Sequence, residues 1–164
     1  MKNIVLFGFM GCGKSTVGQL LAEQTGRTLL DTDSFLEQKY GRRIADIFAE
    51  DGEDAFRAME TAVCRELSDR RGLILCCGGG TVLREENAAI LSQGGTMVFL
   101  DIPFAAAYAR ICGSDRPLVR NNSKEVLEQI FLSRAPVYRS CAQLTVDASQ
   151  SPKQVADAIR NRIK

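Results

Sequence analysis

An apolar run leading into a glycine-rich turn constrains this sequence more than any other feature. Residues 4–7 read Ile-Val-Leu-Phe, and residues 8–16 read Gly-Phe-Met-Gly-Cys-Gly-Lys-Ser-Thr. The spacing of the glycines before Lys14 and Ser15 is that of a Walker A loop. Glycines let consecutive backbone N–H groups curl around a polyphosphate, and a following helix adds its positive dipole end. The sequence therefore predicts a strand, a phosphate-binding loop and a helix, in that order.

The residue types in this loop indicate its ligand. Lys14 can reach the β- and γ-phosphates of a nucleoside triphosphate, and the Ser15 hydroxyl can ligate Mg²⁺. The apolar positions Val17, Leu20 and Leu21 give the following segment the pattern of an amphipathic helix. We therefore expect this chain to bind a nucleoside triphosphate together with Mg²⁺.

Composition narrows the class of protein. The chain has 164 residues, 45% of them hydrophobic, which suits one domain with a substantial core. Its 21 basic and 20 acidic residues are spread throughout, so neither nucleic acid nor a membrane surface is an expected partner. The apolar stretches are strand-sized, and the N-terminus does not read as a secretory signal. We expect a cytoplasmic protein.

Cysteine and histidine usage add two constraints. The six cysteines do not follow zinc-site spacing, and we expect them to be reduced thiols packed as small hydrophobic groups, Cys76 and Cys77 included. The chain has no histidine, which excludes a histidine base or metal ligand.

Apolar runs without polar alternation are separated by helical patterns along the chain. This order predicts an α/β fold with a parallel sheet covered on both faces, whose ligands bind at the carboxyl ends of the strands. The expected strands are 4–8, 28–30, 73–77, 96–100 and 143–146. The expected helices are 15–24, 34–40, 44–49, 53–70, 85–93, 103–110, 123–133 and one from Pro152, with a polar loop at 112–122.

Two carboxylates follow the second predicted strand, at the ligand-binding edge. If the strand geometry continues, Asp31 and Asp33 face the same way. One could hold Mg²⁺ or its water shell, and the other could accept a proton from an attacking hydroxyl. Alternatively, Asp33 or Ser34 only caps the helix that begins near Phe35. The phosphate loop at the same edge favours the functional interpretation.

A glycine triplet and several arginines are further candidates. Gly78, Gly79 and Gly80 follow the third strand, where they allow close approach of a ligand and leave N–H groups free to donate, or only form a flexible turn. Arg57 could be held by Glu60 at i+3, or the two could form a solvated surface pair.

The other arginines lie in the second half of the chain. Arg116 lies in the polar loop 112–122, which could close over phosphates and exclude water. Arg134 is expected just past a helix. Like Arg139, it carries a planar guanidinium group, whose geometry suits a carboxylate. Each arginine taken alone could equally be a surface residue.

Two kinds of nucleotide-binding protein can be compared at this point. A GTPase would need a D-x-x-G after a buried strand and an N-K-x-D guanine reader. The sequence Asp69-Arg-Arg-Gly72 precedes its strand, and N-K-x-D is absent from the sequence. The sequence therefore fits a small-molecule kinase with a short lid better than a GTPase.

Read together, these segments resemble shikimate kinases, small enzymes of the nucleoside-monophosphate-kinase-like group. The similarity covers nearly the whole chain. It rests on the loop at 8–16, Asp31-Thr-Asp33, Phe56-Arg57-x-x-Glu60, Gly78-Gly79-Gly80, Arg116-Pro117-Leu118 and Arg134-Ala-Pro-Val-Tyr138-Arg139. The Walker A loop is shared by many families, whereas the Asp-x-Asp, Phe-Arg-x-x-Glu and Gly-Gly-Gly set in this order is far more particular.

The resemblance implies a five-stranded parallel sheet in the order 2-3-1-4-5, and ATP-dependent phosphorylation of the 3-hydroxyl of shikimate in aromatic amino acid biosynthesis. On the acceptor side, it implies that Asp33 binds and orients or deprotonates the attacking hydroxyl. The carboxylate of shikimate would be held by Arg57 and Arg134, with Gly79 and Gly80 donating from the backbone.

On the donor side, the resemblance implies that Ser15 binds Mg²⁺ and that Asp31 binds its hydration shell. Arg116 would meet the phosphates from the lid. Near the adenine would lie Arg110 and the loop around Ser149–Pro152. The residues implied in phosphate binding are Gly11, Cys12, Gly13, Lys14, Ser15 and Thr16.

The sequence thus predicts one kinase domain over residues 1–164, with a substrate-binding region at about 33–60 and a lid at about 112–122. We expect a monomer that uses ATP and shikimate. One alternative is a kinase of another small hydroxy acid, such as gluconate. An alternative of a different class is a non-catalytic nucleotide-binding regulatory module, which would not need to keep Lys14, Asp33 and Arg116 together.

Overall fold

The computed structural model describes residues 1–163. Its five strands are β1 (Asn3–Phe7), β2 (Thr28–Asp31), β3 (Leu73–Cys76), β4 (Gly95–Asp101) and β5 (Leu144–Asp147). Its helices are α1 (Lys14–Thr25), α2 (Thr32–Tyr40), α3 (Ile44–Asp51), α4 (Glu53–Ser68), the 3₁₀ turn η1 (Thr81–Leu83), α5 (Glu85–Gly94), α6 (Phe104–Ile111), α7 (Pro117–Arg120), α8 (Lys124–Cys141) and α9 (Pro152–Arg162).

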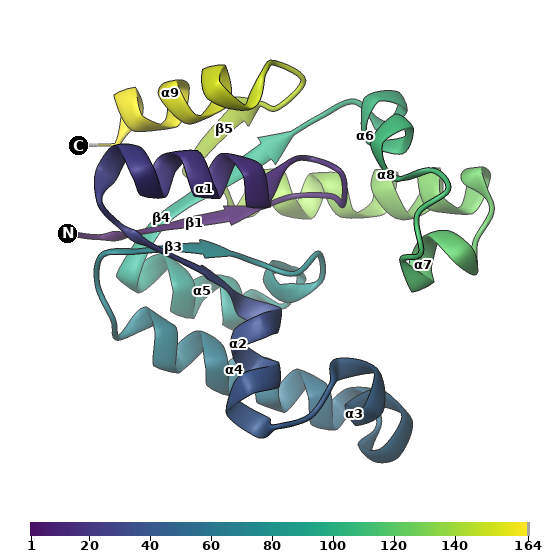
Figure 1. The fold of residues 1–164 in the computed structure, drawn as a ribbon. Coiled ribbons are helices and arrows are strands. Elements are labelled where there is room, and N and C mark those ends of the chain that lie inside the picture. Colours follow the sequence, from purple (N-terminus) through teal and green to yellow (C-terminus); the bar gives the residue numbers. More distant parts are fainter. Residues whose placement is uncertain (164) are drawn as a thin grey trace.

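The strands form one parallel sheet in the order β2-β3-β1-β4-β5, which confirms the predicted fold class and strand order. The central strand β1 is buried along its whole length, and its Val5 is level with Leu75 of β3 and Met97 of β4. Such strands are apolar on both sides because helices cover both faces of the sheet. In Figure 1, α1 and α9 cover one face, and α4 and α5 lie on the other, whereas α8 packs against β4 and η1.

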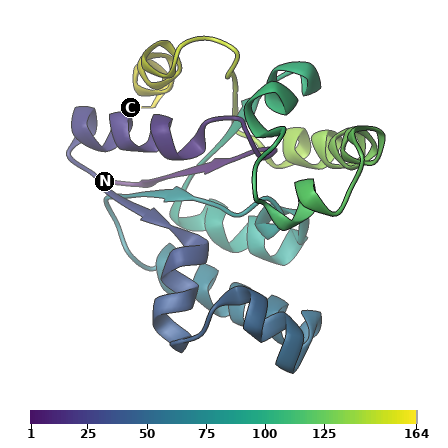
Figure 2. The same ribbon diagram turned by 45° about the vertical axis from the view of Figure 1, so that its right-hand side comes forward.

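The parallel arrangement brings the carboxyl ends of all the strands to one edge of the sheet. The segments that follow β1, β2, β3 and β4 therefore meet there, beside α7 (Figure 1). The helices α2 and α3 lie beyond the β2 edge, on the side away from α9 (Figure 2). No helix within residues 1–163 is both long and apolar enough to span a membrane.

The predicted elements are present, and three details of the prediction were wrong. The helix α8 was expected to end at residue 133 but continues to Cys141, so Arg134 lies inside it. Pro136 is tolerated because it is exposed, where water can satisfy the carbonyl that its missing N–H would have bonded. Meanwhile Ala135 and Tyr138 anchor the helix in the core.

The second wrong detail concerns the predicted polar loop at 112–122, which contains the single helical turn α7. Arg116 precedes that turn, and Pro117 occupies its first position, where the missing N–H of proline costs nothing.

The third wrong detail lies at the end of β2. The helix α2 begins at Thr32, with Asp31 as its N-cap, so neither Asp33 nor Ser34 caps it and the strand alternation does not extend to Asp33.

All six cysteines are free thiols. Cys12, Cys64, Cys76 and Cys77 are buried, as predicted. Cys112 is exposed at the C-cap of α6, just past its last residue Ile111, so the prediction of a packed hydrophobic group was wrong for this residue.

Candidate active site

The phosphate loop adopts a conformation that its glycines permit. Gly11 and Gly13 have φ values of 85° and 90°, which L-residues with side chains rarely adopt. A methyl group on Gly11 would also lie 2.8 Å from the carbonyl oxygen of Ala107. Gly13 caps α1 without a side-chain hydrogen bond, so the first N–H groups of α1 remain available to an anion.

Lys14 is the first residue of α1, and its side chain folds back over the loop. Its ammonium group donates to the carbonyl oxygen of Gly8 at 3.0 Å and lies 3.7 Å from Cys12 Sγ. Cys12 is 1% exposed and does not line the cavity, so this residue offers its backbone and not its thiol to a ligand.

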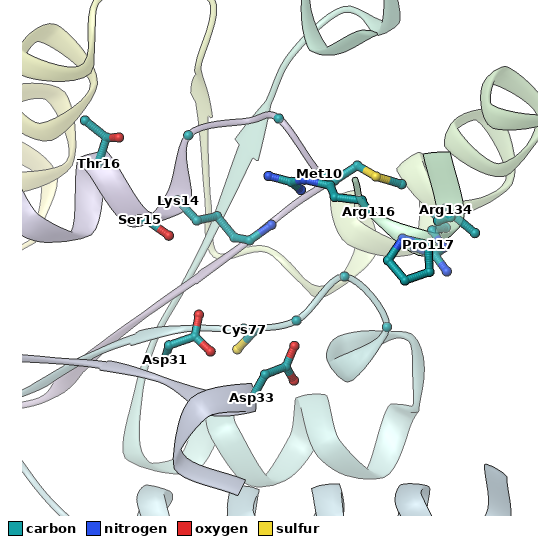
Figure 3. A pocket seen from close by; sticks show the side chains of 16 residues that line it. Met10, Lys14, Ser15, Thr16, Asp31, Asp33, Cys77, Arg116, Pro117 and Arg134 are labelled. Atoms are coloured by element: carbon teal, nitrogen blue, oxygen red, sulfur yellow. The ribbon is translucent and has the colours of Figure 1, made fainter. Parts of the chain in front are cut away.

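A cavity of about 520 Å³ lies between the phosphate loop and the carboxyl ends of β2 and β3. Figure 3 shows Lys14 and Ser15 on one side of it, Asp31 and Asp33 on another, Arg116 reaching in toward Lys14, and Arg134 at the end away from Thr16. The predicted residues that line it are Gly11, Gly13, Lys14, Ser15, Thr16, Asp31, Asp33, Gly78, Gly79, Gly80, Arg116 and Arg134.

The two aspartates have different surroundings. Asp31 is exposed, and one of its oxygens accepts a hydrogen bond from the Ser34 N–H at 3.0 Å. Asp33 lies in the first turn of α2, where burial, reinforced by the nearby charges of Asp31, Glu60 and Glu37, raises its pKa to about 6. Lys14 opposes this shift. Asp33 is therefore a much stronger base than an ordinary aspartate but is still mainly ionised at neutral pH.

The glycine triplet after β3 brings three functional side chains together. A methyl group on Gly78 would lie 2.8 Å from both carboxylate oxygens of Asp33. One on Gly79 would lie 3.2 Å from Arg134 Nη1, and one on Gly80 would lie 3.1 Å from Arg57 Nη1. The loop therefore lacks side chains at the points where Asp33, Arg134 and Arg57 press against it.

The N–H groups of this triplet also differ from one another. Gly78 N–H donates to Thr32 Oγ1 at 3.3 Å, and Thr32 in turn donates to the carbonyl oxygen of Cys76. Within residues 1–163, the N–H groups of Gly79 and Gly80 have no hydrogen-bond partner. These two donors are available to a ligand in the cavity.

Arg57 does not line the cavity, but its guanidinium lies against Gly80 and is held from behind. Its Nη1 donates to Oε1 of Glu60 at 3.0 Å, and Glu60 is only 4% exposed. The other oxygen of Glu60 accepts from Thr81 at 3.0 Å, and Asn87, which is fully buried, bonds both Thr81 and Thr61. The pair is therefore not the solvated surface pair that the sequence left open.

The remaining arginines divide into two groups. Within residues 1–163, neither Arg116 nor Arg134 is paired with a carboxylate, so both can respond to an anionic ligand. Arg139, by contrast, does not line the cavity, and its guanidinium lies 3.7 Å from the carboxylate of Asp101.

The two residues expected near the adenine lie outside the cavity. Arg110 crosses the outer side of the phosphate loop, where its guanidinium donates to the carbonyl oxygens of Gly11 at 2.9 Å and Ala148 at 3.5 Å. Pro152 is exposed at the start of α9. Arg110 thus connects the phosphate loop to the segment after β5, whereas Pro152 is not brought to the other site residues.

Sequence reasoning missed several residues of this site. Met10, Cys77, Pro117 and Leu118 also line the cavity. Met10 lies between two glycines of the phosphate loop, and this position could have indicated it. By contrast, Thr81, Asn87 and the hydroxyl of Tyr138 act from behind the cavity. The sequence pattern carries no signal for Thr81 and Asn87, and it marks Tyr138 only as part of the segment 134–139, without a role.

The fold and the site together define a class. A parallel sheet, a Walker A loop with its lysine, and a second group of carboxylate and arginine side chains facing that lysine are the parts of a P-loop kinase that acts on a small molecule. The comparisons with known proteins narrow this class. The family model for shikimate kinase matches residues 10–164, and the chain belongs to that family. Membership identifies the activity as ATP-dependent phosphorylation of shikimate.

Individual relatives agree with this assignment. A shikimate kinase from Persephonella marina is 38% identical over 165 residues, covering all of both chains. The solved structure of the Acinetobacter baumannii shikimate kinase in complex with shikimate is 37% identical, with a TM-score of 0.89 over 100% of this chain and 96% of that one. A gluconokinase from Sinorhizobium meliloti shares the fold, with 18% identity and a TM-score of 0.59 over 95% of this chain and 87% of that one.

Proposed function

We propose that this chain transfers the γ-phosphoryl group of ATP to the 3-hydroxyl of shikimate, with the phosphate loop holding the donor and the residues around the glycine triplet holding the acceptor. The observation that carries this proposal is the contact of Gly78, Gly79 and Gly80 with Asp33, Arg134 and Arg57 respectively. A base and two guanidinium groups in one place suit an acceptor that has both a hydroxyl and a carboxylate.

The donor half uses the phosphate loop and the lid. The N–H groups from Gly11 to Thr16 surround the phosphates, Lys14 leaves the carbonyl of Gly8 to bind the β- and γ-phosphates, and Arg116 approaches them from the lid at 112–122. Such positive charge stabilises the transition state of phosphoryl transfer, in which charge is spread over the transferred group. Arg110 holds the outer side of the loop, and the adenine would lie beside it and the segment ending at Pro152.

Ser15 and Asp31 are the residues that would hold Mg²⁺ in this half of the site. Both line the cavity, and Asp31 keeps one carboxylate oxygen free of the bond from Ser34. Within the described residues there is no group of three or more His, Cys, Asp or Glu side chains suited to a metal. Phosphate and water oxygens would complete the coordination, which is typical of Mg²⁺, and the ion would neutralise phosphate charge.

The acceptor half positions the hydroxyl for attack. Arg57 and Arg134 hold the carboxylate of shikimate, and the N–H groups of Gly79 and Gly80 donate from the loop between them. Asp33 then binds the ring hydroxyls and orients the attacking one. Its raised pKa of about 6 makes it able to accept the alcohol proton as the bond to phosphorus forms. No histidine is needed for this step.

All these residues come from one chain, and we propose that it acts as a monomeric domain in which Asp33 and Arg57, both in the region 33–60, form part of the acceptor site. Six free thiols suit a reducing compartment, and we place the enzyme in the cytoplasm.

A coupled assay of ADP release tests the proposal. Shikimate, gluconate and nucleoside monophosphates are each offered with MgATP, and release of ADP should depend on shikimate alone. Dependence on gluconate would identify a different hydroxy-acid kinase. Binding of ATP with no turnover on any acceptor would instead identify a regulatory module, and either result refutes the proposal.

A further inference from the structure

The hydroxyl of Tyr138 lies beneath the glycine triplet and has no part in the roles described above. Tyr138 is one turn after Arg134 on α8 and is 1% exposed. Its hydroxyl donates a hydrogen bond to the carbonyl oxygen of Gly79 at 2.5 Å. The bond joins residues that are 59 positions apart in the sequence, so it fixes the triplet to a separate helix.

The ring of Tyr138 is held firmly enough to act as a fixed support. Its centroid lies 6.0 Å from that of Phe7 and 5.5 Å from that of Phe99, two buried aromatic rings of the central strands. Burial raises the pKa of Tyr138 to about 12, although the charge of Arg134 opposes this shift. The hydroxyl therefore keeps its proton at neutral pH and remains a donor.

The triplet needs such a support because glycine imposes little conformation on its backbone. The carbonyl of Gly79 and the N–H of Gly80 belong to one planar peptide unit, and in a trans unit they point in opposite directions. No peptide bond among the described residues is cis. When Tyr138 holds the Gly79 carbonyl, it therefore also fixes the direction of the Gly80 N–H.

That N–H group is one of the two free donors of the triplet, and Gly79 lies directly against Arg134. From this arrangement we infer that Tyr138 is a positioning residue: by holding the Gly79–Gly80 peptide, its hydroxyl aims the Gly80 N–H at the carboxylate-bearing acceptor. The inference rests on the proposed function of the triplet in binding that acceptor. It separates Tyr138 from the core aromatic residues, whose contribution would be packing alone.

The variant Tyr138→Phe tests the inference because it removes one hydroxyl and keeps the ring. Tyr108→Phe is the matched control, since the Tyr108 hydroxyl has no hydrogen-bond partner in the described part of the chain and Tyr108 lies on α6, outside the proposed acceptor site. In Tyr138→Phe, the affinity for shikimate measured by calorimetry should fall about fivefold to about twentyfold, and KM for shikimate should rise by the same factor. This is the effect expected for one lost hydrogen bond and a carbonyl left without its partner. KM for ATP should stay within about twofold, and Tyr108→Phe should match the unmodified chain.

A second measurement reports on the peptide itself. The amide signal of Gly80 in a ¹⁵N-labelled sample without substrates should broaden or exchange faster in Tyr138→Phe than in Tyr108→Phe. Unchanged shikimate binding, or an equal loss of shikimate and ATP binding, would overturn the inference. An unmodified chain without shikimate-dependent turnover would refute the proposed function instead, and the Gly80 amide would still show whether Tyr138 holds the peptide.

Discussion

Replacement of Asp33 by asparagine should stabilise the fold at neutral pH while it removes most of the activity. The pKa of Asp33 rises to about 6 because the carboxylate is partly buried and close to Asp31, Glu60 and Glu37. The folded chain therefore bears a cost for keeping this group ionised. Asparagine has nearly the same shape and no charge, so the variant avoids that cost.

The size of the effect and its sign follow from linkage. An aspartate in the unfolded chain has a pKa of about 3.9, and each pKa unit corresponds to about 1.4 kcal/mol. Because the folded-state pKa of Asp33 is raised, the folded state binds the proton more tightly and loses stability as the pH rises from about 4 to about 6. Relative to the variant, the unmodified chain should lose about 2 kcal/mol between about pH 4.5 and about pH 7.5.

Urea unfolding of both proteins at these two pH values measures the effect. All other titrating groups are common to the two proteins, so the difference between their free energies of unfolding isolates Asp33. Between the lower and the higher pH, the free energy of unfolding of the variant should rise by about 2 kcal/mol relative to that of the unmodified chain. A difference that does not depend on pH would refute the account of Asp33 as a partly buried ionised group.

The same titration should appear in catalysis. If ionised Asp33 orients the attacking hydroxyl, kcat/KM for shikimate should fall below about pH 6, about tenfold per pH unit, as this carboxylate becomes protonated. In Asp33→Asn the turnover number should be lower by about a hundredfold or more. The fall of kcat/KM below about pH 6 should also disappear from the pH profile. Near-normal turnover in a folded variant would exclude Asp33 as orienter or base.

Three further changes test other parts of the site. Arg57→Ala should raise KM for shikimate by about tenfold or more and leave ATP binding nearly intact; an equal loss of both would refute its assigned role. Lys14→Met should abolish transfer, because the γ-phosphate charge would be uncompensated, and residual turnover above about one per cent in the ADP assay would contradict this. Gly79→Ala places a methyl group 3.2 Å from Arg134 Nη1, so shikimate binding measured by calorimetry should weaken while the melting temperature changes little; unaltered binding would show that Arg134 has room to move.

The sequence predicted the fold well because its signals are local. Continuous apolar runs mark buried parallel strands, and the Walker A spacing fixes what joins β1 to α1. The errors lie where tertiary contacts override a local rule. Pro136 marks the end of a helix on local grounds, yet α8 continues because Ala135 and Tyr138 are buried on its inner side.

The site was predictable to the extent that its residues follow strand ends. Asp33 and the glycine triplet come directly after β2 and β3, so topology alone brings them together. The support for Arg57 could not be predicted, because Thr81 and Asn87 reach Glu60 from η1 and α5 and form no motif with it. The closeness of these two residues to Glu60 in space follows from the packing of α4 against α5, which a single sequence does not reveal.

The two halves of the site differ in how they are built, and this difference has a consequence for variants. The phosphate loop is continuous, and apart from the Lys14 ammonium its donors are the N–H groups of neighbouring residues, which side-chain changes do not remove. The acceptor half is assembled on the Gly78–Gly80 loop from residues of α2, α4 and α8, each of which meets a different glycine. A small shift of that loop therefore moves Asp33, Arg134 and Arg57 relative to one another, whereas the donor half is unaffected. Changes behind the loop should for this reason alter shikimate binding first and ATP binding last.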